Sequence, residues 1–278
     1  METSGRAHPQ PWTQPWYYVS DGDPTILIYL IAIHVLAGLG LILFPLPGWD
    51  LFLTTVALTG LGGLGTTLAY HRGLSHRSFQ MHPVVEQILI FFAVFNGSGV
   101  PTNWVANHRN HHANSDTADD VSSPRFGGFW WAHLRCLYQL PTSDISRWCP
   151  DLDRPRYTVW SRLQPVILLG ALAGGYLAFG WAGLFWIGGV RLTYSLHLQA
   201  AVNSLLHLKK DVPIGEDSAR NIGWLGPLQL TAWGENWHEN HHSHPSSARF
   251  GRLWWQIDIG WYTICALEAL GLATRVRR

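Results

Sequence analysis

Histidine is the residue type in this chain whose spacing most clearly points to chemistry. Of the 15 histidines in 278 residues, nine lie in four short motifs. Two motifs have the spacing H-x-x-H-H, one has the spacing H-x-x-x-x-H, and the fourth is N-S-L-L-H, which ends in one histidine. Imidazole nitrogen is a good ligand for iron, copper and zinc. We therefore predict a metal site built from His71, His76, His108, His111, His112, His207, His238, His241 and His242.

The spacing within these clusters suits α-helices. Each helical residue advances by about 100°, so positions i, i+3 and i+4 share one face, which can supply ligands to two neighbouring metals. By the same rule His71 and His76 lie about 140° apart, so we expect them to serve different metals or to straddle a helix end. Asn203 lies four residues before His207, on the same face. Structural zinc needs four ligands, so nine histidines indicate a dinuclear site, although composition alone does not select the metal.

Several carboxylates lie close to the clusters in the sequence. A metal-bound histidine usually donates its other ring N–H to a carboxylate or carbonyl oxygen. We expect Asp120, Glu235 and Glu239 to act in this way. Asp116 and Asp119 are interpreted as solvated loop charges or helix caps.

The elements that must position these residues are predicted to be membrane helices. Four apolar stretches have about the 20 residues that a membrane-spanning helix requires. Short turns join them in pairs, which predicts two helical hairpins, and the segments between and after the hairpins carry all nine clustered histidines. We predict an all-α integral membrane protein with a flexible tail over 1–24 and one domain over 25–278, comprising spans at about 25–44, 51–70, 163–181 and 183–203 and a helical cap over 71–162 and 204–278.

The basic residues predict the orientation of these helices. Seventeen of the 19 Lys and Arg fall between residues 70 and 162 or after 203, and cytoplasmic segments carry the excess of Lys and Arg. The cap and its metal site are therefore expected on the cytoplasmic side. Arg191 falls inside the fourth stretch and should either face the protein interior or extend its charge to the interface. A net charge of +1 excludes a nucleic-acid-binding surface.

The stretch from Gly60 to Gly65 matches the pattern G-x-G-x-x-G. A dinucleotide-binding loop would need a strand before it and an acidic residue about 20 positions later. Here the glycines lie inside an uncharged apolar stretch, where small residues allow helix backbones to approach closely. We interpret them as a helix-packing surface.

Four segments together resemble a known family: HRGLSHRSF, WVANHRNHH, NSLLH and GENWHENHH, which begin at His71, Trp104, Asn203 and Gly234. They resemble the membrane fatty acyl desaturases of the Δ9, stearoyl-CoA-desaturase-like type, in their bacterial branch, and the resemblance covers roughly residues 25–273. It implies that the nine histidines hold two irons (Fe2+/Fe3+) and that Asn203 contacts one of them through a water. It also implies O2-dependent formation of a cis double bond, expected at Δ9, in a saturated acyl chain.

The resemblance also bears on partners and location. The chain has no H-P-G-G haem motif, so electrons are expected from a separate ferredoxin, rubredoxin-like or cytochrome b5-like donor with its reductase. Ala106-Asn107 stands where animal acyl-CoA enzymes carry Arg-Asp, and Asp120-Val121-Ser122 stands in place of the family's D-P-H. These departures leave acyl-CoA and acyl-lipid as alternative substrates. Membrane lipids are the expected surroundings, in the inner membrane if the protein is bacterial.

Two other functions are compatible with parts of this pattern. A related membrane di-iron acyl or alkane hydroxylase would use the same metals and differ in its product. A metal transporter or sensor would place histidines within the membrane spans, where only His34 and His197 are found.

Overall fold

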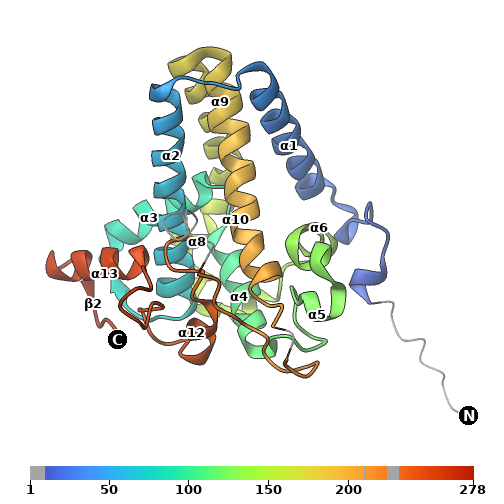
Figure 1. The fold of residues 1–278 in the computed structure, drawn as a ribbon, viewed down its shortest axis with the longest axis vertical. Coiled ribbons are helices and arrows are strands. Elements are labelled where there is room, and N and C mark those ends of the chain that lie inside the picture. The colour runs from blue at the N-terminus through green and yellow to red at the C-terminus, as the bar shows by residue number, and fades with distance from the viewer. Residues whose placement is uncertain (1–9, 210, 224–231) are drawn as a thin grey trace, which may run out of the picture.

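The computed structural model describes residues 10–209, 211–223 and 232–278. Helices dominate it (Figure 1). The α-helices are α1 (Thr25–Leu43), α2 (Trp49–Leu64), α3 (Pro83–Phe95), α4 (Pro101–Asn114), α5 (Pro124–Gly127), α6 (Cys136–Gln139), α7 (Ile145–Trp148), α8 (Pro155–Thr158), α9 (Trp160–Phe185), α10 (Arg191–Leu205), α12 (His238–Ser243) and α13 (Ile259–Ala269). Shorter 3-10 turns are η1 (Pro11–Thr13), η2 (Ser20–Gly22) and η5 (Pro150–Leu152), and π-helical segments are η3 (Gly65–Ser75), η4 (Trp131–Arg135) and η6 (Trp186–Val190).

The mostly helical fold that the sequence predicts is confirmed, with one small exception. Strands β1 (Gln80–Met81) and β2 (Ala273–Thr274) form a two-residue antiparallel pair. The pair fastens the end of the chain beside the segment that follows η3. Two residues are too few to produce an alternating pattern that sequence reasoning could detect.

Within the residues that the structure describes, three helical stretches are long and apolar enough to cross a membrane: Thr25–Leu43, Trp49–Ser75 and Pro155–Leu205. The first has 19 residues, or about 28 Å at 1.5 Å per residue, close to the thickness of a bilayer's hydrocarbon core. The third has 51 residues and reverses direction at Gly180, whose φ is +62°. In Figure 1, α1, α2, α9 and α10 run along the long axis of the molecule, and α4 and α12 lie at one end of them. These stretches fit a membrane protein.

The glycines of α2 and η3 pack against neighbouring elements. A Cβ added to Gly65 would lie 2.4 Å from the carbonyl oxygen of Leu89 in α3, and one added to Gly63 would lie 2.4 Å from the ring of Trp233. Only a residue without a side chain allows this approach. The interpretation of the G-x-G-x-x-G stretch as a packing surface is therefore confirmed for Gly62, Gly63 and Gly65, whereas a Cβ added to Gly60 would meet nothing within 4 Å.

Arg191 faces the protein interior, the first of its two predicted alternatives. Its side chain is fully buried, and its Nε and Nη1 donate to the carbonyl oxygens of Ile187 and Phe95, each at 2.9 Å. The guanidinium also lies 3.9 Å from the centre of the Phe95 ring. These contacts partly offset the cost of burying a charge among apolar helices.

The described part of the N-terminal segment is held against η4 and α6. Tyr138 donates to the carbonyl oxygen of Trp16 at 2.6 Å, and the Gln139 amide donates to that of Pro15 at 2.7 Å. The Trp16 side chain is 65% exposed, as expected for a residue at a membrane interface. Residues 1–9 of the predicted flexible tail lie outside the described residues.

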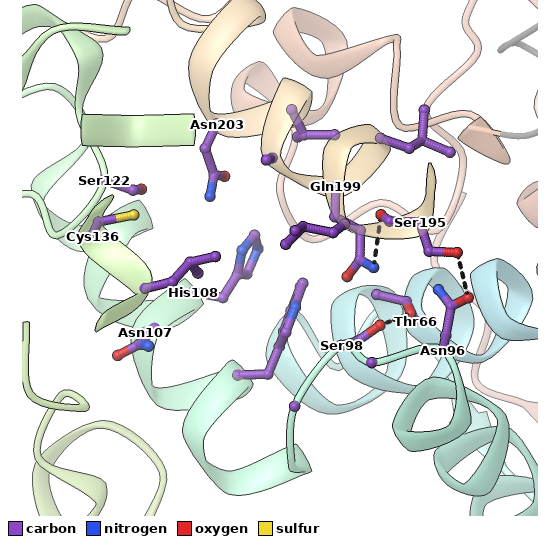
Figure 2. Close-up of a pocket in the computed structure, with 18 of the residues that line it drawn as sticks. Thr66, Asn96, Ser98, Asn107, His108, Ser122, Cys136, Ser195, Gln199 and Asn203 are labelled. Atoms are coloured by element: carbon purple, nitrogen blue, oxygen red, sulfur yellow. Dashed lines mark hydrogen bonds between the residues drawn. The ribbon is translucent and has the colours of Figure 1, made fainter. Parts of the chain in front are cut away.

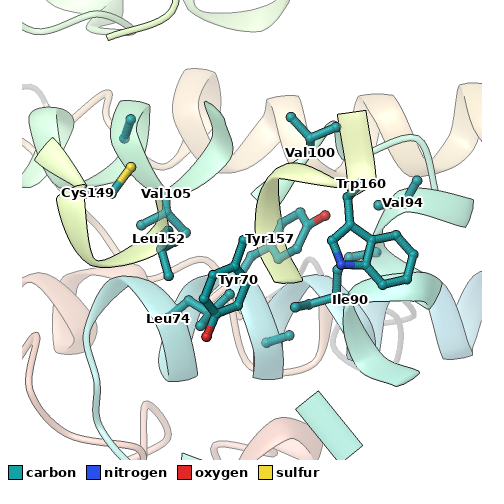
Figure 3. Close-up of a cluster of buried hydrophobic side chains, with 13 residues drawn as sticks. Tyr70, Leu74, Ile90, Val94, Val100, Val105, Cys149, Leu152, Tyr157 and Trp160 are labelled. Carbon is teal, nitrogen blue, oxygen red and sulfur yellow. The ribbon is translucent and has the colours of Figure 1, made fainter. Parts of the chain in front are cut away.

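A buried apolar cluster fixes the histidine-bearing elements η3 and α4 relative to each other (Figure 3). It also includes side chains from α3 and from the segment that leads into α9. Burying a large apolar side chain stabilises a fold by roughly 1.5–3 kcal/mol. The labelled members are Tyr70, Leu74, Ile90, Val94, Val100, Val105, Cys149, Leu152, Tyr157 and Trp160.

A buried ion pair ties the C-terminal segment to η3. Arg72 Nη2 lies 2.9 Å from Asp258 Oδ1, and both side chains are almost completely buried. Asp258 also accepts hydrogen bonds from the backbone N–H groups of Phe250 at 2.7 Å and Trp261 at 2.9 Å. Because Arg72 directly follows His71, this pair also holds the start of the first histidine cluster in place.

Removing the Asp258 carboxylate is expected to destabilise the protein strongly. Asp258→Ala leaves the Arg72 guanidinium buried without its counter-charge, which typically costs about 3–5 kcal/mol. Thermal unfolding in detergent, followed by circular dichroism, should show a lower Tm for this variant. Asp153→Ala, which alters an exposed aspartate, is the control, and an equal Tm for the two variants would contradict the prediction.

Candidate metal centre

The local structure of η3 explains how His71 and His76 come together. Its backbone forms hydrogen bonds between residues five apart, and the last of them joins His76 N–H to the His71 carbonyl at 3.1 Å. Such π-helical bonding stacks residues five positions apart, unlike an α-helix. Both histidines therefore belong to one group, and His76 caps the end of the helix. The expectation that they would serve different metals does not hold, because both lie in one group. The alternative expectation, that they straddle a helix end, is confirmed.

The first group contains five histidines whose ligand nitrogens all lie within 4.8 Å of one another. The Nε2 atom of His241 is central: it lies 2.9 Å from Nε2 of His71 and 3.0 Å from Nε2 of His112. Nε2 of His76 and His108 are 2.9 Å apart. The group draws on η3, α4 and α12, so three segments far apart in the sequence converge on one point.

The second group contains His111, His207, His238 and His242, whose ligand nitrogens also lie within 4.8 Å of one another. Nε2 of His207 is 2.9 Å from Nε2 of His238. Nε2 of His111 and of His242 are buried, and neither has a hydrogen-bond partner in the part of the chain that the structure describes. Buried nitrogens without partners are costly, and a metal ion among them would satisfy them. The donor set of each group fits a metal ion.

Each H-x-x-H-H cluster supplies both groups. In α4, His108 and His112 join the first group and His111 joins the second. In α12, His241 joins the first group, whereas His238 and His242 join the second. Neighbouring residues in one helix thus belong to different groups, and the two copies of the motif together complete both groups.

Two of the three predicted carboxylates contact the histidines as expected. His71 Nδ1 donates to Glu235 at 2.6 Å, and His111 Nδ1 lies 2.9 Å from both oxygens of Asp120. A proton held on Nδ1 leaves the Nε2 lone pair free for a metal. Burial tends to raise the pKa of Glu235, but the charge of His71 outweighs burial and holds this pKa below its ordinary value. Burial tends to lower the pKa of His111, but the negative charge of Asp120 outweighs burial and raises this pKa above its ordinary value.

Two further carboxylates contact histidines without having been predicted to. Asp116 is fully buried and accepts from His207 Nδ1 at 2.9 Å, so its interpretation as a solvated loop charge is wrong. It lies just past α4 with φ of +55°, a conformation that aspartate tolerates better than most residues. Asp217 accepts from His242 Nδ1 at 2.7 Å. The sequence spacing contains no signal for Asp217, because it lies in a loop, 25 residues before His242 of α12. Asp119 is exposed, as expected.

Glu239 and Asn203 occupy different surroundings. Glu239 forms an ion pair with Lys209 at 2.7 Å, and both side chains are about two-fifths exposed. It is the one predicted carboxylate that the structure does not bring to an imidazole among the described residues. Asn203 lies on the last turn of α10 and lines a cavity together with His238.

The charge state of the cluster favours metal binding. Burial, followed by repulsion from neighbouring histidines, holds the pKa of five of them well below the ordinary value: His76, His108, His112, His238 and His241. Burial also lowers the pKa of His242 to about 4, against the hydrogen bond to Asp217. Imidazoles must be neutral to coordinate a metal, and these rings are neutral at physiological pH.

A cavity of about 400 Å³ leads to both histidine groups (Figure 2). His108 of the first group and His238 of the second both line it. Its wall also includes apolar side chains such as Leu30 and Leu196, and polar groups that pair with one another. Ser195 donates to Asn96 at 2.8 Å, and the hydroxyls of Thr66 and Ser98 are 2.7 Å apart.

The fold and the site together define a mostly helical membrane protein with two adjoining histidine groups that could each hold a metal ion. The fatty acid desaturase family model matches residues 47–264, and the chain belongs to this family. It is an oxidoreductase, a fatty acyl desaturase.

Its relatives include proteins acting on different acyl carriers and positions. The chain is 36% identical to a Delta-9 acyl-lipid desaturase 2 of Arabidopsis thaliana, over 88% of this chain and 80% of the relative. It is 33% identical to an sn-1 stearoyl-lipid 9-desaturase of Synechocystis, over 91% and 80%. It is 34% identical to an icosanoyl-CoA 5-desaturase of Limnanthes douglasii, over 96% and 74%.

Proposed function

We propose that this desaturase binds two iron ions, one in each histidine group, and uses O2 to convert a saturated acyl chain into a cis-Δ9 unsaturated one. The observation that carries the proposal is the division of nine histidines into groups of five and four, with members of both groups lining one cavity. Breaking an unactivated C–H bond needs oxygen chemistry that a bound metal supplies and side chains do not. The ligands are the nine histidines, with Asn203 holding a water beside the four-histidine group.

The cavity would position the substrate. Because His108 and His238 line it from different groups, a CH2–CH2 unit lying between them would be close to both metal positions. Holding the chain in a single orientation is what selects one pair of carbons. The Δ9 position is supported by the relatives from Arabidopsis and Synechocystis, whose names specify position 9.

An acyl lipid is the proposed substrate carrier. Pro141 and Thr142 line the cavity and are exposed, which marks an opening there, and Asn103 and Asn107 also line it. Among the described residues that line the cavity there is no Lys or Arg. Coenzyme A carries several phosphate charges, which proteins commonly bind with such cations. Amide groups suit an uncharged lipid backbone better.

The proposed setting is a membrane crossed four times, by α1, by α2 with η3, by α9 and by α10, with the histidines on the cytoplasmic side. The concentration of basic residues in the cap supports this orientation. The two electrons would come from an external ferredoxin, rubredoxin-like or cytochrome b5-like protein.

Expression in a host that lacks Δ9 desaturation, together with a matched electron donor, tests this function. Lipids and acyl-CoA are separated after a short pulse of labelled stearate, and double bonds are located by mass spectrometry after derivatisation. The expected result is labelled Δ9 product that appears first in membrane lipid. Product that appears first in acyl-CoA would overturn the proposal that the substrate is an acyl lipid. Hydroxy acids would favour the hydroxylase alternative, and an unchanged profile from iron-loaded protein would overturn the proposal.

A further inference from the structure

The outer face of α13 is apolar, unlike that of a helix in water. Tyr262, Ala266, Ala269 and the C-cap Leu270 are all exposed. They lie at positions i, i+4, i+7 and i+8, which share one side of an α-helix. Leu270 is 71% exposed. A helix between a protein core and water carries polar residues on its outer face, so the outer face of α13 suits an apolar medium.

The segment that leads into α13 is apolar and exposed as well. Trp254 is 91% exposed, and Leu253, Trp255 and Ile257 are also exposed. Exposed apolar patches of this kind mark contacts with membranes or with other proteins. Tryptophan in particular is enriched where a membrane meets water.

The position of α13 matches that of a membrane surface. Its buried residue Ile264 belongs to the same apolar cluster as Leu68 of η3. From Trp49, the first residue of α2, to Leu68 the helix rises about 28 Å, close to the thickness of a bilayer's hydrocarbon core. In Figure 1, α13 runs across the long axis of the molecule, whereas α2 runs along it. A helix placed in this way lies in the plane of the interface.

Arginines gather beside this apolar surface from two parts of the chain. The N–H of Ala248 donates to the carbonyl of Arg277 at 2.8 Å, which brings the residues after β2 next to those before the apolar segment. The guanidinium of Arg278 lies 5.7 Å from the centre of the Trp261 ring in α13. We call residues 253–257, the outer face of α13 and these arginines the C-terminal surface. Its arginines are Arg249, Arg252, Arg275, Arg277 and Arg278.

Most of this positive charge has no counter-charge within the protein. Residues 249–278 contain two acidic side chains, Asp258 and Glu268. Asp258 is buried against Arg72, and Glu268 pairs with Arg278 at 2.6 Å. In the part of the chain that the structure describes, the other four arginines of the C-terminal surface form no ion pair. The surface therefore offers a positive charge to a negatively charged partner.

We infer that the C-terminal surface binds the headgroups of anionic phospholipids. Its apolar residues would lie among the headgroups and upper acyl carbons, and its arginines would donate charge-assisted hydrogen bonds to phosphate oxygens. Lipids with a net negative charge are favoured, because a zwitterionic headgroup also presents a positive group to the arginines. The inference goes beyond the proposed reaction and depends only on the membrane setting. Because Asp258 ties this segment to Arg72, the contact also connects the membrane surface to the neighbouring His71.

Titration of the metal-free, full-length protein in neutral detergent measures this binding. Short-chain phosphatidylglycerol is the probe, and native mass spectrometry counts the lipid molecules bound at each concentration. Each arginine near a lipid surface strengthens binding about fivefold. Arg275→Gln combined with Arg277→Gln should therefore weaken phosphatidylglycerol binding about 25-fold, whereas binding of phosphatidylcholine should not change.

The matched control is Arg147→Gln combined with Arg154→Gln, which removes the same charge from two exposed arginines elsewhere in the cap. This variant should bind phosphatidylglycerol like the unaltered protein. Equal binding by all three proteins, or an equal loss in both double variants, would overturn the inference.

A second measurement leaves the arginines unchanged. In nanodiscs that contain phosphatidylglycerol, protein labelled with 5-fluorotryptophan gives a 19F signal for Trp254, which Trp254→Phe identifies by its loss. A nitroxide on the upper acyl chain of the lipid should broaden this signal far more than a water-soluble gadolinium chelate does, because Trp254 lies in the interface. The reverse order would place Trp254 in water and would overturn the inference.

An acidic electron-donor protein is the other partner that this charge could attract. If both double variants bound lipid like the unaltered protein, and Arg275→Gln combined with Arg277→Gln alone lost turnover with the external donor, the surface would belong to the donor and the inference would be overturned. Neither binding measurement requires desaturation. Unaltered protein that binds phosphatidylglycerol but makes no double bond would therefore contradict the proposed function and leave the lipid contact standing.

Discussion

Replacing His241 with alanine is expected to abolish desaturation and to lower the iron content of the purified protein. Its Nε2 atom lies within 3.0 Å of both His71 and His112, at the centre of the five-histidine group, and the side chain is completely buried. The loss should exceed the roughly 100-fold effect of removing a carboxylate behind a metal ligand. Metal analysis of the variant and product formation in membranes are the two measurements.

The matched control for this substitution lies three residues away. His244 is exposed and belongs to neither group, so His244→Ala should keep its iron and its activity. If His241→Ala kept two iron ions per chain, the assignment of the ligands would be wrong.

Asp116→Asn is expected to lower metal affinity and activity by about 10–100-fold. The Asp116 carboxylate accepts from His207 Nδ1 and from Ser123 and Ser218, each at 2.9 Å or less. The asparagine has the same shape but no charge, so it holds the Nδ1 proton of His207 less firmly. That weakens the basicity of Nε2 at the metal position. Iron titration of the metal-free protein measures the effect.

Asp119→Asn provides the comparison, because the same chemical change is made at an exposed residue only three positions further on. It should bind iron like the unaltered protein. Equal iron affinity in the two variants would show that the carboxylate of Asp116 does not support the site.

The sequence predicts much of this molecule because two of its signals are strong. Apolar stretches of membrane length locate α1 and the starts of α2 and α9 to within a few residues. The fourth stretch is placed less well, because the prediction starts it at residue 183, whereas α10 begins at Arg191. The histidine clusters are recognised because their spacings match the helical repeat. The chain reverses direction at Gly180, inside α9 and close to the turn expected at residue 182.

Other features depend on geometry that spacing does not record. His71 and His76 share a group because η3 is π-helical, whereas α-helical arithmetic separates them. Asp116 reaches His207 across 91 residues of chain, and Asp217 reaches His242 across 25. Both aspartates lie in loops, and loops have no periodicity from which to predict their partners.

The alternation of neighbouring histidines between the two groups has a further consequence. His111 and His112 differ by one residue of α4, which is a rise of about 1.5 Å and a rotation of about 100°. The backbone of α4 therefore fixes how the two histidine groups lie relative to each other. A one-residue insertion between His108 and His111 would rotate His111 and His112 by about 100° relative to His108, and would so separate His108 from His112, its partner in the first group.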